Sequence, residues 1–467
     1  MKHPKKSKNR KLKEAKPKGG KPSLAAAWAL DFLNSLVLLR ALFQDEVGEA
    51  FTRLLKWLAK EGEVDALKGL GRYGRLWKAV TESQEFIRHP RVGNSLQDHW
   101  LERFLDDPNA LHRKADLAPG QIGPALSEAY LQELEHFQKI LKTDWREEVQ
   151  KRTTVMDKTE VPNWDVAGQG SGHFPLFVEA RKGLKEKVLS GKPKAYALVD
   201  EIAQHFYKNG WGLFGHYRAF RWAASPEGGQ LEGVEFNDPI RLENLVGYDE
   251  QRKPLIENIE AFVAGKGANN ALLYGERGTG KSSTVKALLN AYREKGLRLV
   301  EVAAADLKDF HRVLKLLRGR PEKFILFVDD LSFEETETSY KGLKALLEGD
   351  VEATPANVIL IATSNRRHLI REFFDDRTGG LQKDGEIHGA DTVEEKLSLS
   401  DRFGLVISFY SPDQDTYLKM VDNWAKVEKI KMSAEELHRR ALQWEKANNV
   451  RSGRTARQFI NDLKGKV

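Results

Sequence analysis

The residues most suggestive of chemistry lie between Gly275 and Ser282, where the chain reads Gly-Glu-Arg-Gly-Thr-Gly-Lys-Ser. This run fits the pattern G-x-x-x-x-G-K-[S/T]; it follows a short apolar segment and precedes one with helical spacing. In a strand, loop and helix of this kind, backbone N–H groups and the helix N-terminus point at phosphate oxygens, Lys281 reaches the β and γ phosphates, and the Ser282 hydroxyl ligates Mg²⁺. The pattern predicts a nucleotide phosphate site, called the P-loop below, made by Gly275, Glu276, Arg277, Gly278, Thr279, Gly280, Lys281, Ser282 and Ser283.

Two carboxylates follow the apolar run 324–328, which we predict to be a buried strand. After a P-loop such a strand is expected to hold the metal, so Asp329 would coordinate Mg²⁺ through water, and Asp330 would orient or deprotonate the attacking water. The alternative is that the two acids cap the following turn. The next apolar run, 358–363, is followed by Asn365, whose amide could contact the γ-phosphate and position that water, although asparagine at a strand end is also common in turns.

A sheet is needed to position these side chains, and the sequence after residues 226–229 has the pattern of a domain that contains one. Short β-rich apolar runs alternate there with helical segments, which is typical of a three-layer α/β domain with a mainly parallel sheet. We predict five strands, at 271–274, 298–302, 324–328, 358–363 and 405–409. After Ser411-Pro412 only helical patterns remain, at 417–427, 434–444 and 455–463, which predicts a small C-terminal helical domain.

The first half of the chain is patterned as helices. Apolar residues recur at helical spacing from residue 24 to 43 and again in 51–58, 129–141, 182–189 and 195–207, whereas 153–173 is turn-rich and is predicted to be a loop. The predicted domains are therefore a tail (1–22), a mostly helical accessory region (23–236), a nucleotide-binding core (237–410) and a helical lid (411–467).

An aromatic cluster ends this helical half and is interspersed with the basic residues Lys208, Arg218 and Arg221. Such a mixture can stack on single-stranded bases, but it is more often a hydrophobic joint between domains. The cluster consists of Phe206, Tyr207, Trp211, Phe214, Tyr217, Phe220 and Trp222.

The charge of the chain is unevenly distributed. The net charge is +7, yet residues 1–22 hold ten basic side chains against Glu14, so this tail carries +9 and the other 445 residues carry −2. The folded part therefore lacks the overall basic character of a nucleic-acid-binding protein. The tail, rich in lysine and poor in apolar residues, is predicted to be disordered, either as a solubilising arm or as a contact for nucleic acid or an anionic surface.

The composition excludes several kinds of chemistry. The chain has no cysteine, so it contains no disulfide, thiolate zinc site, cysteine-ligated iron–sulfur cluster or cysteine nucleophile. The same absence favours a reducing, cytoplasmic location. The most apolar stretch, 23–43, contains Asp31, Asn34 and Arg40, so we expect no membrane-spanning helix. Because no histidine and carboxylate grouping has convincing transition-metal spacing, Mg²⁺ is the only metal predicted.

The order of these motifs resembles the AAA+ ATPase superfamily, and across 200–467 it more narrowly resembles a family of bacterial AAA+ ATP-binding proteins of uncharacterised function. The resemblance rests on the runs 275–283, 329–334, 362–369, 398–404 and 452–459, and on 238–248, which is similar to the segment that wraps adenine. It implies that Val246, Gly247 and Tyr248 bind the nucleotide. Residues 1–190 lie largely outside the match.

The resemblance implies roles for two arginines. Arg402 looks like the arginine finger that a neighbouring subunit inserts to neutralise charge on the transferred phosphoryl group. Arg457 looks like the sensor-2 arginine of the lid, with Arg454 as a close second. One departure is that the superfamily usually has Asp-Glu where this chain has Asp329-Asp330, so hydrolysis is expected to be slow, or to be assisted by Glu334 or Glu335. The run 366–368, Arg-Arg-His, is predicted to form ion pairs with the acidic segment 334–337.

These features together predict an AAA+ ATPase that binds ATP and Mg²⁺, assembles as a homo-oligomer, and uses hydrolysis between subunits to act on an unidentified protein or nucleic-acid target. The alternative is a nucleotide-gated binding module or scaffold with little turnover. A third hypothesis, a DNA or RNA loader, rests on the tail and the aromatic cluster alone.

Overall fold

The computed structural model describes residues 20–62, 64–84, 90–107, 109–117, 120, 122–153, 161–165, 177–194, 196–235, 238–331, 347, 354–365 and 402–465. The chain forms two compact units, Met1–Gly215 and His216–Val467. The tail prediction falls on residues 1–19, which lie outside the described part, and the predicted loop 153–173 is described only in part.

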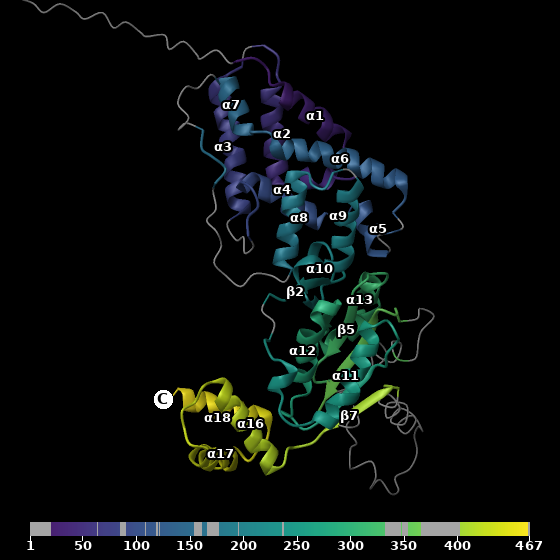
Figure 1. The fold of residues 1–467 in the computed structure, drawn as a ribbon, viewed down its shortest axis with the longest axis vertical. Coiled ribbons are helices and arrows are strands. Elements are labelled where there is room, and N and C mark those ends of the chain that lie inside the picture. The colour runs from purple at the N-terminus through teal and green to yellow at the C-terminus, as the bar shows by residue number, and fades with distance from the viewer. Residues whose placement is uncertain are drawn as a thin grey trace, which may run out of the picture. The chain divides into compact units, whose positions relative to one another are not determined.

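The first unit is built of helices, as predicted (Figure 1). Asp45 shows how local sequence starts one of them: its side chain caps α2 through the N–H of Gly48 at 2.8 Å, and it also binds His99 Nε2 at 2.8 Å. Burial raises the pKa of Asp45, but the hydrogen bonds from His99 and Gly48 outweigh it, so the pKa is lowered overall. The helices are α1 (Leu24–Ser35), α2 (Glu46–Leu58), α3 (Ala66–Ser83), α4 (Ser95–Asp106), α5 (Ala110–Leu117), α6 (Pro124–Lys142), α7 (Trp145–Thr153), α8 (Val178–Ser190), α9 (Tyr196–Asn209) and α10 (Gly212–His216).

The helical pattern from residue 24 to 43 does not form one helix. Helix α1 ends at Ser35, and a short 3₁₀ turn, η1 (Arg40–Phe43), follows. The Glu133 carboxylate accepts hydrogen bonds from the backbone N–H groups of Val37, Leu38 and Leu39 at 2.8–3.1 Å. Because a side chain almost a hundred residues away satisfies these donors, the backbone can leave the helix without losing hydrogen bonds.

Aromatic side chains fill the core of this unit. The ring of Phe51 lies 4.7 Å from Trp100 and 5.1 Å from Trp145, in edge-to-face geometry. Phe206, from the aromatic cluster, is fully buried in the same core, and Phe220 and Trp222 are buried in the second unit. These three rings are therefore not available as stacking platforms for bases.

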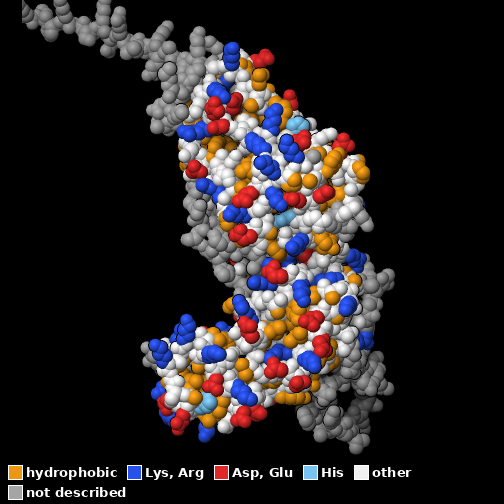
Figure 2. Space-filling view, viewed as in Figure 1, with side chains coloured by type: hydrophobic (Ala, Val, Ile, Leu, Met, Phe, Trp, Pro, Cys, Tyr) orange, Lys and Arg blue, Asp and Glu red, His pale blue; other side chains and the backbone are white. Residues whose placement is uncertain are grey.

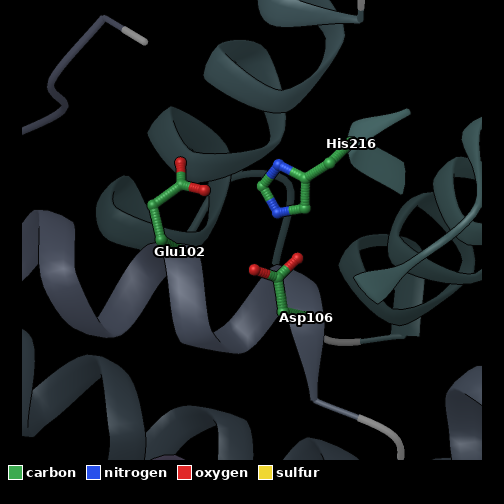
Figure 3. Close-up of side chains that lie close together, drawn as sticks. All are labelled: Glu102, Asp106 and His216. Atoms are coloured by element: carbon green, nitrogen blue, oxygen red, sulfur yellow. The ribbon is translucent and has the colours of Figure 1, made fainter. Parts of the chain in front are cut away.

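A row of buried and half-buried charged side chains joins α4 to α8. Lys185 Nζ lies 2.7 Å from Asp98 and 2.6 Å from Glu102, and Arg181 Nη2 lies 2.5 Å from Glu102 and 3.2 Å from Asp106. Figure 3 shows the carboxylate side chains of Glu102 and Asp106 extending from α4. Since both carboxylates already face cations from α8, we do not assign a metal to them.

The second unit is organised by one sheet with the strand order β2-β1-β4-β5-β6-β3-β7. Every neighbouring pair is parallel except β1 and β2, and the register pairs Leu272 with Ala362 and with Val406. The strands are β1 (Ala219–Ala223), β2 (Gln230–Gly233), β3 (Ala271–Gly275), β4 (Leu297–Glu301), β5 (Lys323–Val328), β6 (Val358–Ser364) and β7 (Leu405–Phe409).

The five predicted strands are present as β3 to β7, but the predicted number of strands was too small. The hairpin of β1 and β2 extends the sheet beside β4, within the range 23–236 that was expected to be mostly helical. Its strands are four or five residues long, too short to show a clear alternation, and β1 pairs with residues 299–301, about eighty positions away. The predicted domain limits themselves stay predictions.

Helices flank the sheet and complete the unit (Figure 1). Helices α11 (Asp249–Val263) and α12 (Lys281–Tyr292) pack on one sheet face, with α13 (Phe310–Leu317) between β4 and β5 in the chain. Short 3₁₀ turns occur at η4 (Leu242–Asn244), η5 (Arg293–Lys295) and η6 (Ala304–Asp309). The predicted lid is formed by α16 (Gln414–Val427), α17 (Ala434–Asn448) and α18 (Gly453–Lys464), which share a small apolar core around Tyr417 and Phe459.

Two further features of the structure concern the charge distribution on the surface and the hydropathy of the helices. On the face shown in Figure 2, Lys and Arg side chains are interspersed with Asp and Glu side chains over the described surface. In the part of the chain that the structure describes, no helix has both the length and the hydropathy needed to cross a bilayer.

Candidate nucleotide site

The P-loop connects β3 to α12, as the sequence predicted. Gly275, Gly278 and Gly280 adopt φ angles of 134°, 80° and 96°, a region that side chains with a Cβ rarely enter. A Cβ on Gly275 would also lie 1.9 Å from the carbonyl oxygen of Phe409 on β7. Glycine is therefore required where the loop leaves the sheet.

Lys281 is held inside the loop that precedes it. Its Nζ lies 2.7 Å from the carbonyl oxygens of Gly275 and Glu276 and 3.3 Å from Asn365 Oδ1. Burial lowers the pKa of Lys281, although Asp330 and Asp329 act in the opposite direction. The ammonium group thus sits among acceptors at the start of α12, where phosphate oxygens could replace the loop carbonyls.

The acidic pair lies beside this lysine, at the C-terminal end of β5. Ser282 Oγ donates to Asp329 Oδ1 at 2.6 Å, and Thr363 Oγ1 donates to the same oxygen at 2.5 Å. Thr363 Oγ1 also accepts from the backbone N–H of Asp330 at 2.9 Å, and the Asn365 amide donates to the Asp330 carboxylate. The structure therefore brings all four predicted residues of this group together, with Thr363 between the two acids.

Thr363 is a site residue that the sequence reasoning missed. The sequence predicted it only as the last residue of a strand, and it is 1% exposed. Asp330 adopts a φ of 52°, an unusual conformation for a residue other than glycine. Because the Thr363 hydroxyl holds the N–H of Asp330, it fixes the turn in which that conformation occurs.

The expected adenine segment lies where the core meets the lid. Gly247, with a φ of 78°, is so close to α16 that a Cβ there would lie 2.7 Å from Thr416 Cγ2. Tyr248 OH donates to the carbonyl oxygen of Tyr410 at 2.5 Å, and burial, together with the charge of Glu276, raises the pKa of Tyr248 to about 12. These contacts fix the segment beside the chain that leads into the lid.

The two lid arginines occupy different places. Arg457 stacks over the Trp424 ring, with its guanidinium carbon 4.9 Å from the ring centroid. Arg454 lies in the first turn of α18, beside the P-loop: its N–H donates to the carbonyl of Gly278 at 3.3 Å, and its charge contributes to the lowered pKa of Lys281. Arg454, the second choice from the sequence, therefore lies nearer the phosphate end than Arg457.

These elements enclose a cavity of about 600 Å³. Among the described residues that line it, six carry positive charge and two carry negative charge: Arg252, Arg277, Lys281, Lys286, Arg454 and Arg457 against Asp329 and Asp330. An excess of positive charge in a partly closed site favours a polyanion. Arg252, Met420 and Trp424 were not predicted, because nothing in their local sequence distinguishes them from ordinary helix residues.

Not all predicted site residues line this cavity. Val246, Tyr248, Asn365 and the loop from Arg277 to Ser283 do, whereas Gly247, Gly275 and Glu276 are not among its lining residues. Arg402 is half-buried just before β7, the edge strand of the sheet, and does not line the cavity of its own chain. Glu334, Glu335 and the run 366–368 lie outside the described residues.

The residues present fit a magnesium ion. Ser282 and Asp329 offer a hydroxyl and a carboxylate oxygen 2.6 Å apart, next to the lysine of the P-loop. Hard oxygen ligands of this kind, combined with phosphate oxygens, are what Mg²⁺ prefers. Ser282 and Asp329 are thus the residues that would hold it.

A parallel sheet with β3 flanked by β6 and β7, a P-loop after β3, acids after β5 and a helical lid define a P-loop protein of the AAA+ class. Residues 215–467 match the profile of a family described as "Protein of unknown function (DUF815)". Because the match covers more than half of the chain, the protein belongs to this family, which is an AAA+ ATPase family.

Individual relatives match over shorter segments. The replication factor C large subunit of Staphylothermus marinus is 37% identical over 81 residues, 16% of this chain and 18% of the relative. The probable mitochondrial chaperone BCS1-A of Dictyostelium discoideum is 27% identical over 172 residues, 31% of this chain and 40% of the relative. The chain thus spans less than half the length of either relative.

Solved structures found to be similar include the Thermotoga maritima RuvB Holliday junction branch migration motor, with 15% identity and a TM-score of 0.30. The FIGL-1 AAA domain in complex with ADP has 16% identity and a TM-score of 0.34. Each comparison covers 48% of this chain and 72% of the other chain. At these scores the likeness carries no information about what this protein acts on.

Proposed function

We propose that the second unit binds ATP with Mg²⁺ and hydrolyses it. The observation that supports this most directly is the convergence of Lys281, Ser282, Asp329 and Asp330 on one positively charged cavity of about 600 Å³. A nucleoside triphosphate would place its phosphates on the P-loop and its base toward Val246, Met420 and Trp424. The bound Mg²⁺ would neutralise charge on the β and γ phosphates.

The chain's own residues supply the remaining parts of hydrolysis. Lys281 offers a point charge to the β and γ phosphates. Asp330 is the group that would orient and deprotonate the attacking water, with Asn365 bonded to its carboxylate and Thr363 bonded to its backbone. Arg454 would neutralise charge from the lid side, a role for which its position beside Gly278 suits it better than Arg457.

We propose further that hydrolysis occurs between subunits of a homo-oligomer. Arg402 carries this part, because it lies before the edge strand β7 and outside its own chain's cavity. A finger of this kind acts on the nucleotide of a neighbouring subunit. The cycle would then move the lid and do conformational work on a protein or nucleic-acid target that remains to be identified. A cytoplasmic location stays a prediction from the sequence.

A second candidate function is a nucleotide-gated binding module with little turnover. The observation that favours it is the identity of Asp330, whose side chain is one methylene shorter than the glutamate usual at this position and is already bonded to Asn365. A base that reaches less far activates water less well. Such a protein would hold ATP and recruit its partner in the ATP-bound state.

Two variants and two matched controls test the proposal. Lys281→Ala should weaken ATP binding about 100-fold or more, because charge-assisted hydrogen bonds to two phosphates are lost. Asp330→Asn should keep ATP affinity within a few-fold and abolish hydrolysis. Lys308→Ala and Asp415→Asn make the same charge changes at exposed positions outside the cavity and should change neither.

The measurements are ATP affinity by calorimetry and phosphate release at saturating ATP. Loss of binding in both variants would refute the role given to Asp330. Tight binding by the unaltered protein with negligible release, even in lysate fractions that contain its partners, would favour the gated binding module over the ATPase.

A further inference from the structure

A short segment, residues 410–413, connects β7 to α16, the first helix of the lid (Figure 1). Asp413 caps α16 by accepting a backbone N–H of its first turn at 2.8 Å, so this end of the connection is fixed to the lid. Pro412 has a restricted φ and confines the residue before it to extended backbone angles. A change in the angle between the core and the lid must therefore be absorbed mainly by Tyr410 and Ser411.

Both of these residues are held by side chains from the nucleotide site. The Tyr248 hydroxyl donates to the carbonyl oxygen of Tyr410 at 2.5 Å. The Ser411 hydroxyl donates to the carboxylate of Glu276, the second residue of the P-loop. The two holding side chains are neighbours, since burial and then the charge of Glu276 raise the pKa of Tyr248. The connection to the lid is thus attached to the adenine segment at one residue and to the P-loop at the next.

The backbone of Glu276 joins the same point to the phosphate end of the site. Its N–H donates to the carbonyl oxygen of Phe409, the last residue of β7, at 3.1 Å. Its carbonyl oxygen accepts from Lys281 Nζ at 2.7 Å and from Thr279 Oγ1 at 2.8 Å. Glu276 is therefore in direct contact with the lysine expected to bind the β and γ phosphates and, through its side chain, with the connection to the lid.

Phosphate binding would change the contacts on one side of Glu276. The three donors of Lys281 contact two loop carbonyls, one of them that of Glu276, and the side chain of Asn365. An anionic phosphate oxygen is a stronger acceptor than a carbonyl, so it would weaken the hold of Lys281 on the loop. Glu276 could then shift relative to β7, and its carboxylate would carry the Ser411 hydroxyl with it.

The P-loop also contacts the last helix of the lid. The Arg454 N–H, in the first turn of α18, donates to the carbonyl oxygen of Gly278 at 3.3 Å. A Cβ on Gly278 would lie 2.8 Å from Ser452 Oγ, which shows how closely the loop approaches the lid. The contact of Glu276 is at the residues that can turn, whereas the contact of Gly278 is at the part of the lid that covers the loop. The first contact can therefore control how well the second is made.

We propose that Glu276 is a positioning residue, whose carboxylate holds Ser411 and thereby keeps the lid in the orientation that retains bound nucleotide. This inference rests on the proposed function, because it requires a nucleotide on the P-loop. Glu276 acts through the lid, since it is not among the residues that line the nucleotide cavity. Without the hydrogen bond between Glu276 and Ser411, the lid opens more often and nucleotide leaves faster.

The release of a fluorescent nucleotide from the full-length protein tests this role. The probe is N-methylanthraniloyl-ADP, bound with Mg²⁺ and displaced by excess ADP in a stopped-flow experiment. Glu276→Ala and Ser411→Ala should each raise the dissociation rate about fivefold, the usual effect of one hydrogen bond. The double variant should release the probe no faster than either single variant, because both substitutions remove the same bond.

Controls separate the hydrogen bond from the charge of the carboxylate. Removing a negative charge near the phosphates would by itself slow release, because it removes a repulsion, so faster release cannot come from the charge. Glu276→Gln loses the charge but keeps an acceptor for the Ser411 hydroxyl, and it should release the probe no faster than the unaltered protein. Glu227→Ala makes the same charge change at an exposed position outside the cavity and should leave the rate unchanged.

The inference is overturned if the unaltered protein binds the probe but Glu276→Ala and Ser411→Ala release it within about twofold of the unaltered rate, less than one hydrogen bond predicts. Release from the double variant that is about 25-fold faster, the product of two independent effects, would show that the two side chains do not act as a pair. Thermal unfolding without nucleotide should be unchanged in both single variants, because the bond is exposed. A lowered midpoint with unchanged release would indicate a purely structural role. If the unaltered protein binds no probe, the proposed function itself is refuted, and this inference with it.

Discussion

Replacing Thr363 by valine should separate nucleotide binding from hydrolysis. Valine has nearly the same shape, so the fully buried strand β6 should remain packed. The change removes a hydrogen bond to the charged Asp329 and one to the Asp330 N–H, which together are worth about 2 to 4 kcal/mol. The Asp329 carboxylate keeps its bond to Ser282. The loss therefore falls mainly on the turn that holds Asp330.

The expected kinetic effect follows from this geometry. Asp330 adopts a φ of 52°, and without the Thr363 hydroxyl the turn can relax toward commoner backbone angles. A displacement of about 1 Å at a group that positions water typically costs about 100-fold in rate. ATP affinity should change less than about fivefold, since the contacts of Lys281 with the P-loop are untouched.

Phosphate release at saturating ATP and ATP affinity by calorimetry measure the two effects on the same samples. Thr363→Ser, which keeps the hydroxyl and loses a methyl group, should retain turnover within about threefold, because it keeps both hydrogen bonds. Turnover of Thr363→Val within twofold of the unaltered protein would refute the positioning role. An equal loss in the serine variant, which keeps the hydroxyl, would show that the hydroxyl alone does not account for the effect of the valine substitution.

The remaining predictions concern assembly, buried charge and acid stability. Arg402→Ala should bind ATP nearly normally but hydrolyse it about 1000-fold more slowly. Mixing Arg402→Ala subunits with Lys281→Ala subunits should restore some phosphate release. Unchanged turnover in the Arg402→Ala variant would exclude a finger acting between subunits. Lys185→Met should destabilise the helical unit by about 3 to 5 kcal/mol in urea unfolding, because it leaves the fully buried Asp98 uncompensated. The double variant Asp98→Leu with Lys185→Met should recover most of this loss. Equal destabilisation by the single and the double variant would contradict this account. The lowered pKa of Asp45 means that its contribution to stability is present above the ordinary value of 3.8 and is lost as pH falls through the folded-state value. Asp45→Asn should therefore lower stability at neutral pH and have a progressively smaller effect as pH falls below 3.8, measured by thermal unfolding across that range.

Features that depend on the local spacing of residues could be predicted from the sequence. The P-loop could be recognised because its glycines, lysine and serine act through a contiguous stretch of backbone, and β3 to β7 could be placed because continuous apolar runs mark strands buried on both faces. The acids after β5 and Asn365 after β6 could be grouped because parallel strands bring their C-terminal ends to one edge.

Other features depend on residues that are distant in the chain, and only the tertiary structure decided them. Glu133 ends the helical pattern at Ser35, and the pairing of β1 with β4 adds a hairpin to the sheet. The position of Arg454 beside Gly278 depends on how α18 approaches the P-loop. The contacts of Thr363 with Asp329 and Asp330 depend on hydrogen bonds between neighbouring strands, and such contacts leave no periodicity or motif in the local sequence.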